Sequence, residues 1–418
     1  MLYSAFSHIN GEHFRKPTDM LMSNKKQRIG LVLSMVPAYS ETFFRNKIRV
    51  LENAGFTVIL FVGGGKDAAG SFRHLRIGYD SQTSSLRKIL PGILAVIRLI
   101  INAPGAYNLF RLNRSDGFSL RKNLISLLNA AHIVGYKLDW LHFGFASNGI
   151  LLENLALVTG AKMAVSIRGY DISLHPIKYP GCYALLWKRI DKLHYLSDYQ
   201  YRKALDDGLS GDVEAMQIEP AVDPSILGKM SSLPTPLSNP VVQFLTIGRL
   251  TWKKGYPQML NALRLLKAEG IHFKYRIIGE GSDMEEILYL IKAFALENEV
   301  VLDGKKDHAE TMDLLSRCDI YLQYSVQEGF CNAVIEAQLL GRLCIVSDAE
   351  GLPENVINEK TGWVVPANEP LSLKERILEV ISLPEAQREK IRMDASERIV
   401  NEFSLSVQER KFIRFYGL

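Results

Sequence analysis

Short apolar runs of strand character alternate with amphipathic helical patterns along nearly all of this 418-residue chain. Examples are "RIGLVLSMV" from Arg28, "FTVILFV" from Phe56, "KMAVSIR" from Lys162, "VVQFLTIG" from Val241 and "RLCIVSD" from Arg342. Continuously apolar strands separated by helices are typical of parallel sheets that carry helices on both faces. The pattern therefore predicts an α/β fold built from doubly wound, Rossmann-like sheets.

The alternation stops once, in the segment "DPSILGKMSSLPTPLSNP", residues 223–240, which is rich in proline and serine. Such segments without periodicity are typical of linkers, and the chain length favours about two domains. We expect a first domain over residues 1–235 and a second over residues 236–402. The amphipathic segment at residues 403–418 is expected to pack back on the first domain.

Composition excludes several classes of protein. The net charge of +5, from 50 basic and 45 acidic residues, is spread along the chain and does not favour nucleic acid as a partner. No segment reaches the roughly 18 uninterrupted apolar residues of a membrane-spanning helix. The four cysteines show no C-x-x-C spacing. The polar N-terminal residues have no continuous apolar stretch, so we expect a loose leader there and not a signal peptide. We expect a cytoplasmic protein and leave open a peripheral attachment to the inner-membrane surface.

One apolar segment, residues 86–114, carries arginines and a lysine at its edges. It has two interpretations. It is either a core helix whose basic residues point to water, or a helix that lies in a membrane interface. We favour the core helix, because amphipathic helices usually face a core.

Loops that follow strands of the second half carry side chains suited to a phosphate-bearing ligand. In doubly wound sheets, ligands bind at the carboxyl ends of the strands. Arg249 and Lys254 follow a strand that ends near Ile247, and two cations before a helix suit a diphosphate. Gly281, in "GEG", is expected to let the backbone approach a ligand. The alternative for the first loop is a solvated basic loop.

The stretch "QEGFCNAVIEAQ" places Glu328 and Glu336 eight positions apart around a predicted helix start. We expect the amides of Gly329, Phe330 and Cys331 to be free for sugar hydroxyls or a phosphate oxygen. Glu336 lies among apolar residues and is costly to bury unless it is bonded, so we expect it to reach a ribose. The alternative is a pair of structural glutamates, one near the helix dipole and one on the surface.

Together these segments resemble the retaining GT-B glycosyltransferases of glycosyltransferase family four. The resemblance lies in "SVQEGFCNAVIE", "GRLTWKKG", "GEG" and "GLPENVINEKTGWVVP", and covers nearly all of residues 241–400. It implies two Rossmann-like domains that face a central cleft. It also implies a donor site in the second domain, an acceptor site in the first, and a metal-independent reaction.

By this resemblance, Arg249 and Lys254 hold the donor diphosphate, Glu336 the ribose and Glu328 the transferred sugar. Residues expected to border the sugar pocket or the base are Gly281, Lys305, Gly329, Phe330, Cys331 and Asn332. The donor is expected to be a UDP or GDP sugar, with no cofactor and no metal.

The first half resembles bacterial exopolysaccharide and colanic-acid-type transferases in "PAYSETFF", "LHFGFASNG" and "SIRGYDIS". It departs from them in two places: Ser40 and Glu41 stand where many members have paired glycines, and Arg168 stands where many have a histidine. A guanidinium cannot act as a base, so Arg168 is expected to bind a phosphate or carboxylate, in a catalytic or acceptor-binding role. His142 is a catalytic candidate if it faces the cleft, and the alternative is a satisfied structural histidine. Asp171 either orients Arg168 or caps a helix.

The sequence thus predicts a retaining hexosyltransferase that moves a sugar from a nucleotide-diphosphate donor to a glycan, lipid-linked acceptor in surface polysaccharide synthesis. One alternative is a sugar-nucleotide 2-epimerase of the same architecture. Another is a non-catalytic sugar-nucleotide-binding protein, which the unusual Arg168 keeps open.

Overall fold

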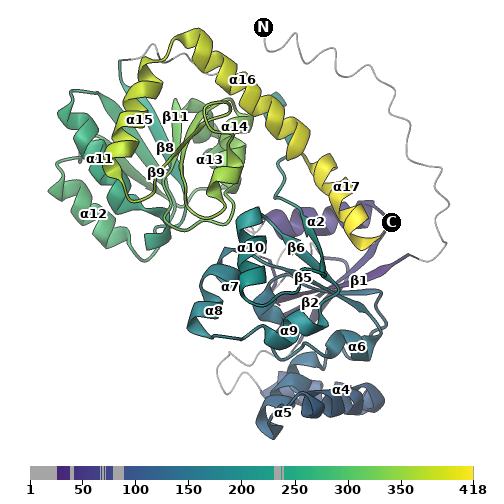
Figure 1. Cartoon of the computed structure of the whole chain (residues 1–418). Helices are drawn as coiled ribbons and strands as arrows, with labels where there is room; N and C mark the ends of the chain where they lie inside the picture. Colours follow the sequence, from purple (N-terminus) through teal and green to yellow (C-terminus); the bar gives the residue numbers. More distant parts are fainter. Residues whose placement is uncertain are drawn as a thin grey trace, which may run out of the picture.

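The computed structural model describes residues 26–37, 42–65, 67, 70, 72–78, 89–229, 237 and 240–417. Two separate sheets dominate it (Figure 1). One is seven-stranded, with the order β3-β2-β1-β4-β5-β6-β7, and the other is six-stranded, with the order β10-β9-β8-β11-β12-β13. Every strand pairing within them is parallel. The predicted fold class, two doubly wound α/β units, is confirmed.

The strands of the first sheet are β1 (Arg28–Met35), β2 (Thr57–Gly64), β3 (Leu75–Ile77), β4 (Trp140–Phe143), β5 (Lys162–Ser166), β6 (Lys192–Tyr195) and β7 (Glu214–Gln217). Its helical elements are α2 (Thr42–Asn53), α3 (Ile89–Ile101), α4 (Ala103–Ser115), α5 (Leu120–Ala130), η3 (Ala146–Gly149), α6 (Leu155–Thr159), α7 (Gly169–Ser173), α8 (His175–Lys178), α9 (Ala184–Arg189) and α10 (Asp198–Asp206). The central strands are buried on both sides, which explains their continuous apolar sequences.

The strands of the second sheet are β8 (Val242–Ile247), β9 (Phe273–Ile278), β10 (Val300–Gly304), β11 (Ile320–Gln323), β12 (Leu343–Ser347) and β13 (Trp363–Val365). The helical elements that follow β7 are η4 (Pro224–Lys229), η5 (Trp252–Lys254), α11 (Tyr256–Ala268), α12 (Met284–Ala293), α13 (His308–Arg317), α14 (Asn332–Leu339), η6 (Leu352–Asn355), α15 (Pro370–Ser382), α16 (Glu385–Glu402) and α17 (Leu405–Tyr416). The expected domain boundary near residue 235 falls outside the described residues.

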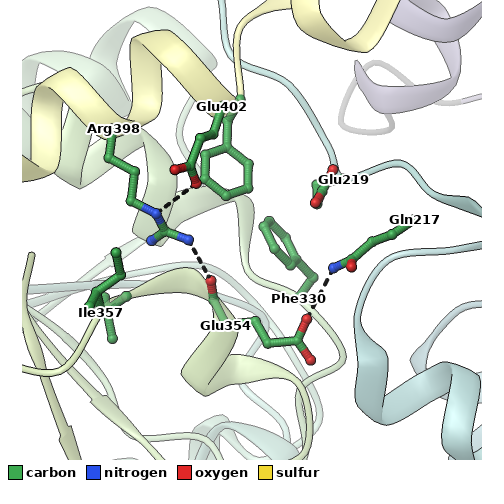
Figure 2. A pocket seen from close by; sticks show the side chains of 9 residues that line it. Gln217, Glu219, Phe330, Glu354, Ile357, Arg398 and Glu402 are labelled. Atoms are coloured by element: carbon green, nitrogen blue, oxygen red, sulfur yellow. Dashed lines mark hydrogen bonds and ion pairs between the residues drawn. The ribbon is translucent and has the colours of Figure 1, made fainter. Parts of the chain in front are cut away.

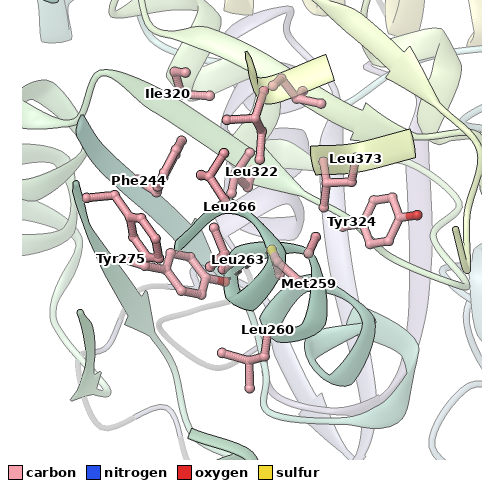
Figure 3. Packing of buried hydrophobic residues seen from close by; sticks show 14 of the residues in the cluster. Phe244, Met259, Leu260, Leu263, Leu266, Tyr275, Ile320, Leu322, Tyr324 and Leu373 are labelled. Atoms are coloured by element: carbon pink, nitrogen blue, oxygen red, sulfur yellow. Dashed lines mark hydrogen bonds between the residues drawn. The ribbon is translucent and has the colours of Figure 1, made fainter. Parts of the chain in front are cut away.

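Helix α11 packs its apolar face on the second sheet (Figure 3). Met259 and Leu263 are fully buried there, beside Tyr275 of β9. The hydroxyl of Tyr275 donates to Thr246 Oγ1 at 2.9 Å, so this buried polar group is paired. Burial of each such large side chain contributes about 2 kcal/mol, and the packed helix fixes the loop that precedes it.

The chain returns to the first unit at its C-terminal end. Helix α16 lies along the second unit and ends at Glu402, and α17 packs against α2 (Figure 1). Val222 donates its N–H to the carbonyl of Phe403 at 2.9 Å, which ties the outgoing and returning segments together. The side chain of Tyr416 reaches the first sheet and contacts His142.

The apolar segment within residues 86–114 is not a core helix, so our favoured interpretation of it is wrong for α3. The segment forms two helices, α3 and α4, with an angle of 98° between them. Pro104 lies in the first turn of α4, where its ring prevents α3 from continuing. No single helix among the described residues is long and apolar enough to cross a membrane.

Candidate functional site

The loops after β8 and β11 are bound directly to each other. The N–H groups of Val326 and Gln327 donate to the carbonyl oxygen of Lys253, at 2.8 and 3.2 Å. Gly255 has a φ of +66°, and a Cβ added there would lie 2.1 Å from the carbonyl oxygen of Tyr324. Only glycine permits this approach, which explains the glycine at the end of "GRLTWKKG".

This contact brings Lys254 and Glu328 together as an ion pair. Both side chains are largely shielded, with 16% and 18% of their areas exposed. Burial acts to lower the pKa of Lys254, but the neighbouring Glu328 carboxylate raises it above the ordinary lysine value. Lys254 is therefore a fixed cation at the carboxyl end of the second sheet.

Two further cations border this pair. Arg249 is exposed just after β8, and Lys253 is half-buried. Burial, together with the charge of Arg249, lowers the pKa of Lys253. The structure thus brings Arg249 and Lys254 into one loop with a third cation, an arrangement that suits an anion with several charges.

The glycines of the loop after β9 serve packing between loops. Gly279 has a φ of +151°, and a Cβ at Gly281 would lie 2.1 Å from the carbonyl oxygen of Leu250. Leu250 also accepts from the N–H of Asp283 at 3.0 Å. Gly281 therefore permits a close approach to the loop after β8. A larger residue at this position would push the two loops apart.

The N-terminus of α14 differs from the expected one. The helix begins at Asn332, which is half-buried, and the N–H of Cys331 donates to Asn355 Oδ1 at 3.1 Å. The expectation that the Cys331 amide is free is wrong, because the Asn355 side chain occupies it. The Phe330 side chain packs against Phe403, with ring centroids 5.8 Å apart, so it points towards α16.

Glu336 is half-buried on α14, and its Oε1 lies 3.4 Å from Nε2 of His308 at the start of α13. The hydrogen bond that His308 donates to Glu336 raises the pKa of His308. Lys305, three residues before His308, is exposed after β10. Sequence analysis missed His308, although its position directly after the helix-capping Asp307 marks the end of a strand-to-helix loop.

Arg168 precedes α7 in the first unit, at the carboxyl end of β5. Its guanidinium lies 3.8 Å from the ring centroid of Phe43, and it also faces Phe44 and Phe145 at 5.0 and 5.6 Å. Stacking on aromatic faces fixes the plane of a guanidinium while it keeps its charge. The two other residues expected in this region, Ser40 and Glu41, lie outside the described residues.

Asp171 is fully buried within α7. Its Oδ1 accepts from the N–H and the hydroxyl of Ser147, at 3.2 and 2.8 Å. Burial raises the pKa of Asp171 to about 6, although the bonds from Ser147 oppose the shift. The carboxyl group therefore ties α7 to η3 and holds the backbone next to Arg168.

His142 does not face a cleft, so its place among the catalytic candidates is wrong and the structural alternative is correct. It is fully buried, with Nδ1 2.5 Å from the hydroxyl of Tyr416 and Nε2 2.7 Å from Oγ of Ser166. Burial and the charge of Lys47 lower its pKa well below the ordinary histidine value. His142 is thus a neutral residue that joins the first sheet to α17.

The two units meet at their glycine-containing loops. A Cβ added to Gly329 would lie 3.3 Å from Cα of Gly169 and 2.1 Å from Nε2 of Gln200. Beside this contact, the ammonium of Lys253 lies 5.7 Å from the ring centroid of Tyr170. The loop that carries Glu328 therefore faces the loop that carries Arg168.

A second contact between the units is made by Glu354. Its carboxylate accepts from the backbone N–H groups of Asp198 and Tyr199, at 3.1 and 3.3 Å. It also accepts from Gln217 Nε2 at 3.0 Å (Figure 2). A carboxylate at the N-terminus of α10 is stabilised by the helix dipole. This contact holds η6 of the second unit on the first.

A pocket of about 320 Å³ lies next to this contact, and Arg398 binds the Glu354 carbonyl and the Glu402 carboxylate there (Figure 2). Its lining residues are Gln217, Glu219, Phe330, Glu354, Val356, Ile357, Arg398, Glu402 and Phe403. The pocket is separate from the charged pair of Lys254 and Glu328. Among the described residues, no group of three or more histidines, cysteines or acidic residues could hold a metal ion.

The fold and this site together define a class. Two parallel-sheet Rossmann-like units, with charged loops at the strand ends facing each other, are the GT-B architecture of glycosyltransferases. The solved structures that share the fold include a glycosyltransferase of Rickettsia africae, with a TM-score of 0.67 at 18% identity, covering 94% of this chain and 98% of the other. Anabaena HepE in complex with UDP has a TM-score of 0.69 at 14% identity, covering 93% and 98%.

Sequence relatives agree with this class. The family "Glycosyl transferases group 1" matches residues 235–398. The colanic acid biosynthesis glycosyltransferase WcaL of Escherichia coli K12 is 27% identical, over 90% of this chain and 97% of WcaL. The amylovoran biosynthesis glycosyltransferase AmsK of Erwinia amylovora is 27% identical, over 90% and 95%. Residues 235–398 are a glycosyl transferases group 1 domain, and the chain is homologous to WcaL and AmsK.

Proposed function

We propose that this glycosyltransferase moves a hexose from a nucleotide-diphosphate sugar to a lipid-linked glycan acceptor, with retention of configuration, during synthesis of a surface polysaccharide. The names of WcaL and AmsK, which refer to colanic acid and amylovoran, support the polysaccharide role. The single observation that carries the proposal is the Lys254 and Glu328 pair at the strand ends, opposite the loop of Arg168.

In this proposal the donor diphosphate lies beside Arg249 and Lys254. As the bond between the sugar and the diphosphate breaks, negative charge grows on the leaving group, and these two cations stabilise it. The raised pKa of Lys254 keeps its ammonium charged through the neutral range. This would supply the electrostatic stabilisation that a metal ion supplies elsewhere.

Glu328 changes its partner in the proposed complex. In the structure it neutralises Lys254, so a donor phosphate would compete for the same ammonium. The released carboxylate would then accept hydrogen bonds from the hydroxyls of the transferred sugar. Glu336, in helix α14, is proposed to bind the ribose. His308 would orient the Glu336 carboxylate through their hydrogen bond.

Retention is proposed because the two charged loops face each other across the contact of Gly169 and Gly329. An acceptor held by the first unit would then approach the sugar from the face that the diphosphate leaves. The donor phosphate would take the proton of the acceptor hydroxyl, and Arg168 would bind an anionic group of the acceptor.

The test is donor binding measured by thermal shift, with a panel of UDP and GDP sugars. A donor at 100 times its dissociation constant raises the free energy of unfolding by about 2.7 kcal/mol. Lys254→Met should abolish the shift, whereas Lys292→Met, at an exposed lysine of α12, should leave it unchanged. If no sugar nucleotide shifts the wild-type transition, or if Lys254→Met responds fully, the proposed donor site is wrong.

A further inference from the structure

Helix α3 exposes its largest side chains. Eight aliphatic residues of this 13-residue helix are between 44% and 73% exposed. The most exposed are Leu90, Ile100 and Ile101, and Ile93 and Ile97 extend the same face. A continuous apolar surface of this kind on a folded chain marks an interaction site.

The inward face of α3 carries two small residues and one large one, Leu99. Ala95 is buried, Gly92 is half-buried, and Leu99 packs against the core of the first unit. This is the reverse of a core-facing helix, in which the large apolar side chains point inward. Residues on the opposite side of α3 attach the helix to the first unit, so the outward Ile and Leu side chains are not needed for that packing.

The surface around α3 is strongly basic. Described residues 89–138 contain six cations and one acidic residue, and that acid, Asp116, is paired with Arg189 at 3.0 Å. The six cations are Arg98, Arg111, Arg114, Arg121, Lys122 and Lys137. On α5, exposed Arg121 and Lys122 follow an exposed Leu120. Apolar and cationic side chains thus lie on adjoining helices, since α3 and α4 both contact α5.

Neither α3 nor α4 is long enough to cross a bilayer by itself. The 13 residues of α3 extend over about 20 Å, against about 30 Å for the hydrocarbon core of a bilayer. The angle of 98° between α3 and α4 also prevents them from acting as one long helix. In Figure 1, α4 and α5 lie at the end of the first unit that is distant from the second sheet, so a planar surface can approach them.

We propose that this α3–α5 surface, formed by the exposed aliphatic face of α3 and the cations of α4 and α5, docks on an anionic lipid bilayer. The aliphatic side chains of α3 enter the boundary between headgroups and acyl chains, and the arginines and lysines bind the anionic headgroups. A second copy of the chain is a poorer partner, because a two-fold contact would place the same cations against each other. The inference is independent of the donor chemistry, because docking needs neither donor nor acceptor.

The test is sedimentation of the full chain with vesicles. Vesicles of phosphatidylcholine mixed with phosphatidylglycerol should retain the protein, and vesicles of phosphatidylcholine alone should bind it weakly. High salt should reduce binding to the anionic vesicles, because screening shortens the reach of the surface charge.

Matched variants distinguish binding through the α3–α5 surface from nonspecific binding to vesicles. Ile97→Glu, at a residue 46% exposed, should weaken vesicle binding by about tenfold or more, because a charge replaces an apolar side chain that enters the bilayer boundary in the proposed complex. Leu288→Glu on α12, at a residue 49% exposed, is the control and should bind as the wild type does. Arg121→Gln should weaken binding by about fivefold, and Arg264→Gln on α11 should not. Unchanged unfolding midpoints show that each variant is folded.

Three results would overturn the proposal. The first is equal binding to the neutral and the anionic vesicles. The second is wild-type binding by Ile97→Glu. The third is sedimentation velocity without vesicles that shows a wild-type dimer and a monomeric Ile97→Glu variant, which would assign the α3–α5 surface to a second copy of the chain.

Discussion

Gly329 of the second unit lies so close to Gly169 of the first that an added Cβ would be 3.3 Å from the Gly169 Cα. This contact joins the loop of Glu328 to the loop of Arg168, and it has no room for a side chain on Gly329. The arrangement of the charged groups between the two units therefore depends on this glycine.

Gly329→Ala should strongly reduce sugar transfer. Its Cβ would lie 2.1 Å from Nε2 of Gln200, which is fully buried, so either the Gln200 side chain or the loop of Glu328 must shift. We expect a loss of about tenfold to a hundredfold in kcat/KM, since small displacements of positioned groups are costly. Gly169→Ala, whose Cβ would be at an ordinary 3.6 Å from Gly329 N, and Gly211→Ala, with nothing within 4 Å, are the controls. Equal activity in all three variants would show that the close contact at Gly329 does not position the loop of Glu328.

The ion pair of Lys254 and Glu328 should show energetic coupling. Because both side chains are largely shielded, Lys254→Met or Glu328→Gln alone leaves one charge without its partner and should cost about 1–3 kcal/mol of the free energy of unfolding. The double variant should be less destabilised than the sum of the two. Chemical denaturation measures all four free energies, and strict additivity would show that the pair contributes nothing.

Asp171 should make the free energy of unfolding depend on pH. Its folded pKa of about 6 is above the ordinary 3.8, so the folded chain binds the proton more tightly than the unfolded chain. The free energy of unfolding should fall as pH rises from about 4 to about 6, by on the order of 1–3 kcal/mol. Asp171→Asn keeps an acceptor for Ser147 and should lose this dependence. The wild-type and variant curves should differ most above about pH 6, and parallel curves would contradict the assignment.

His308 should report the state of Glu336. The hydrogen bond to Glu336 raises the pKa of His308, so Glu336→Gln should return that pKa towards 6.5. An NMR titration of the His308 ring follows this directly. If Glu336 binds the donor ribose, the same variant should raise the KM for donor more than it lowers kcat. Glu310→Gln, in the same helix, is the control for a general effect on α13.

The positions of several candidate site residues could be predicted, because they depend only on which strand each residue follows in the sequence. Arg249, Lys254 and Glu328 each follow a strand of a parallel sheet, and such strand ends meet at one edge. The sequence left two interpretations of His142 open, because its burial depends on α17, which lies more than 270 residues further along the chain. The direction of Phe330 depends in the same way on Phe403 of the returning segment.

The orientation of the apolar helix α3 could not be predicted, for a different reason. Its sequence is compatible with a core helix or a surface helix. Periodicity does not show whether the small residues face the core or the solvent. The packing of Ala95 against the first unit decides this, and it leaves Ile97 and Ile100 outward.

The most direct test of the account is the anomeric configuration of the transferred sugar, read by NMR from the first product formed with a nucleotide-sugar donor and a lipid-linked glycan acceptor. The account predicts a product with the configuration of the donor, formed by the wild type and lost in both Lys254→Met and Glu328→Gln. An inverted product, a new stereoisomer of the sugar nucleotide formed without acceptor, or full activity in either variant would contradict it.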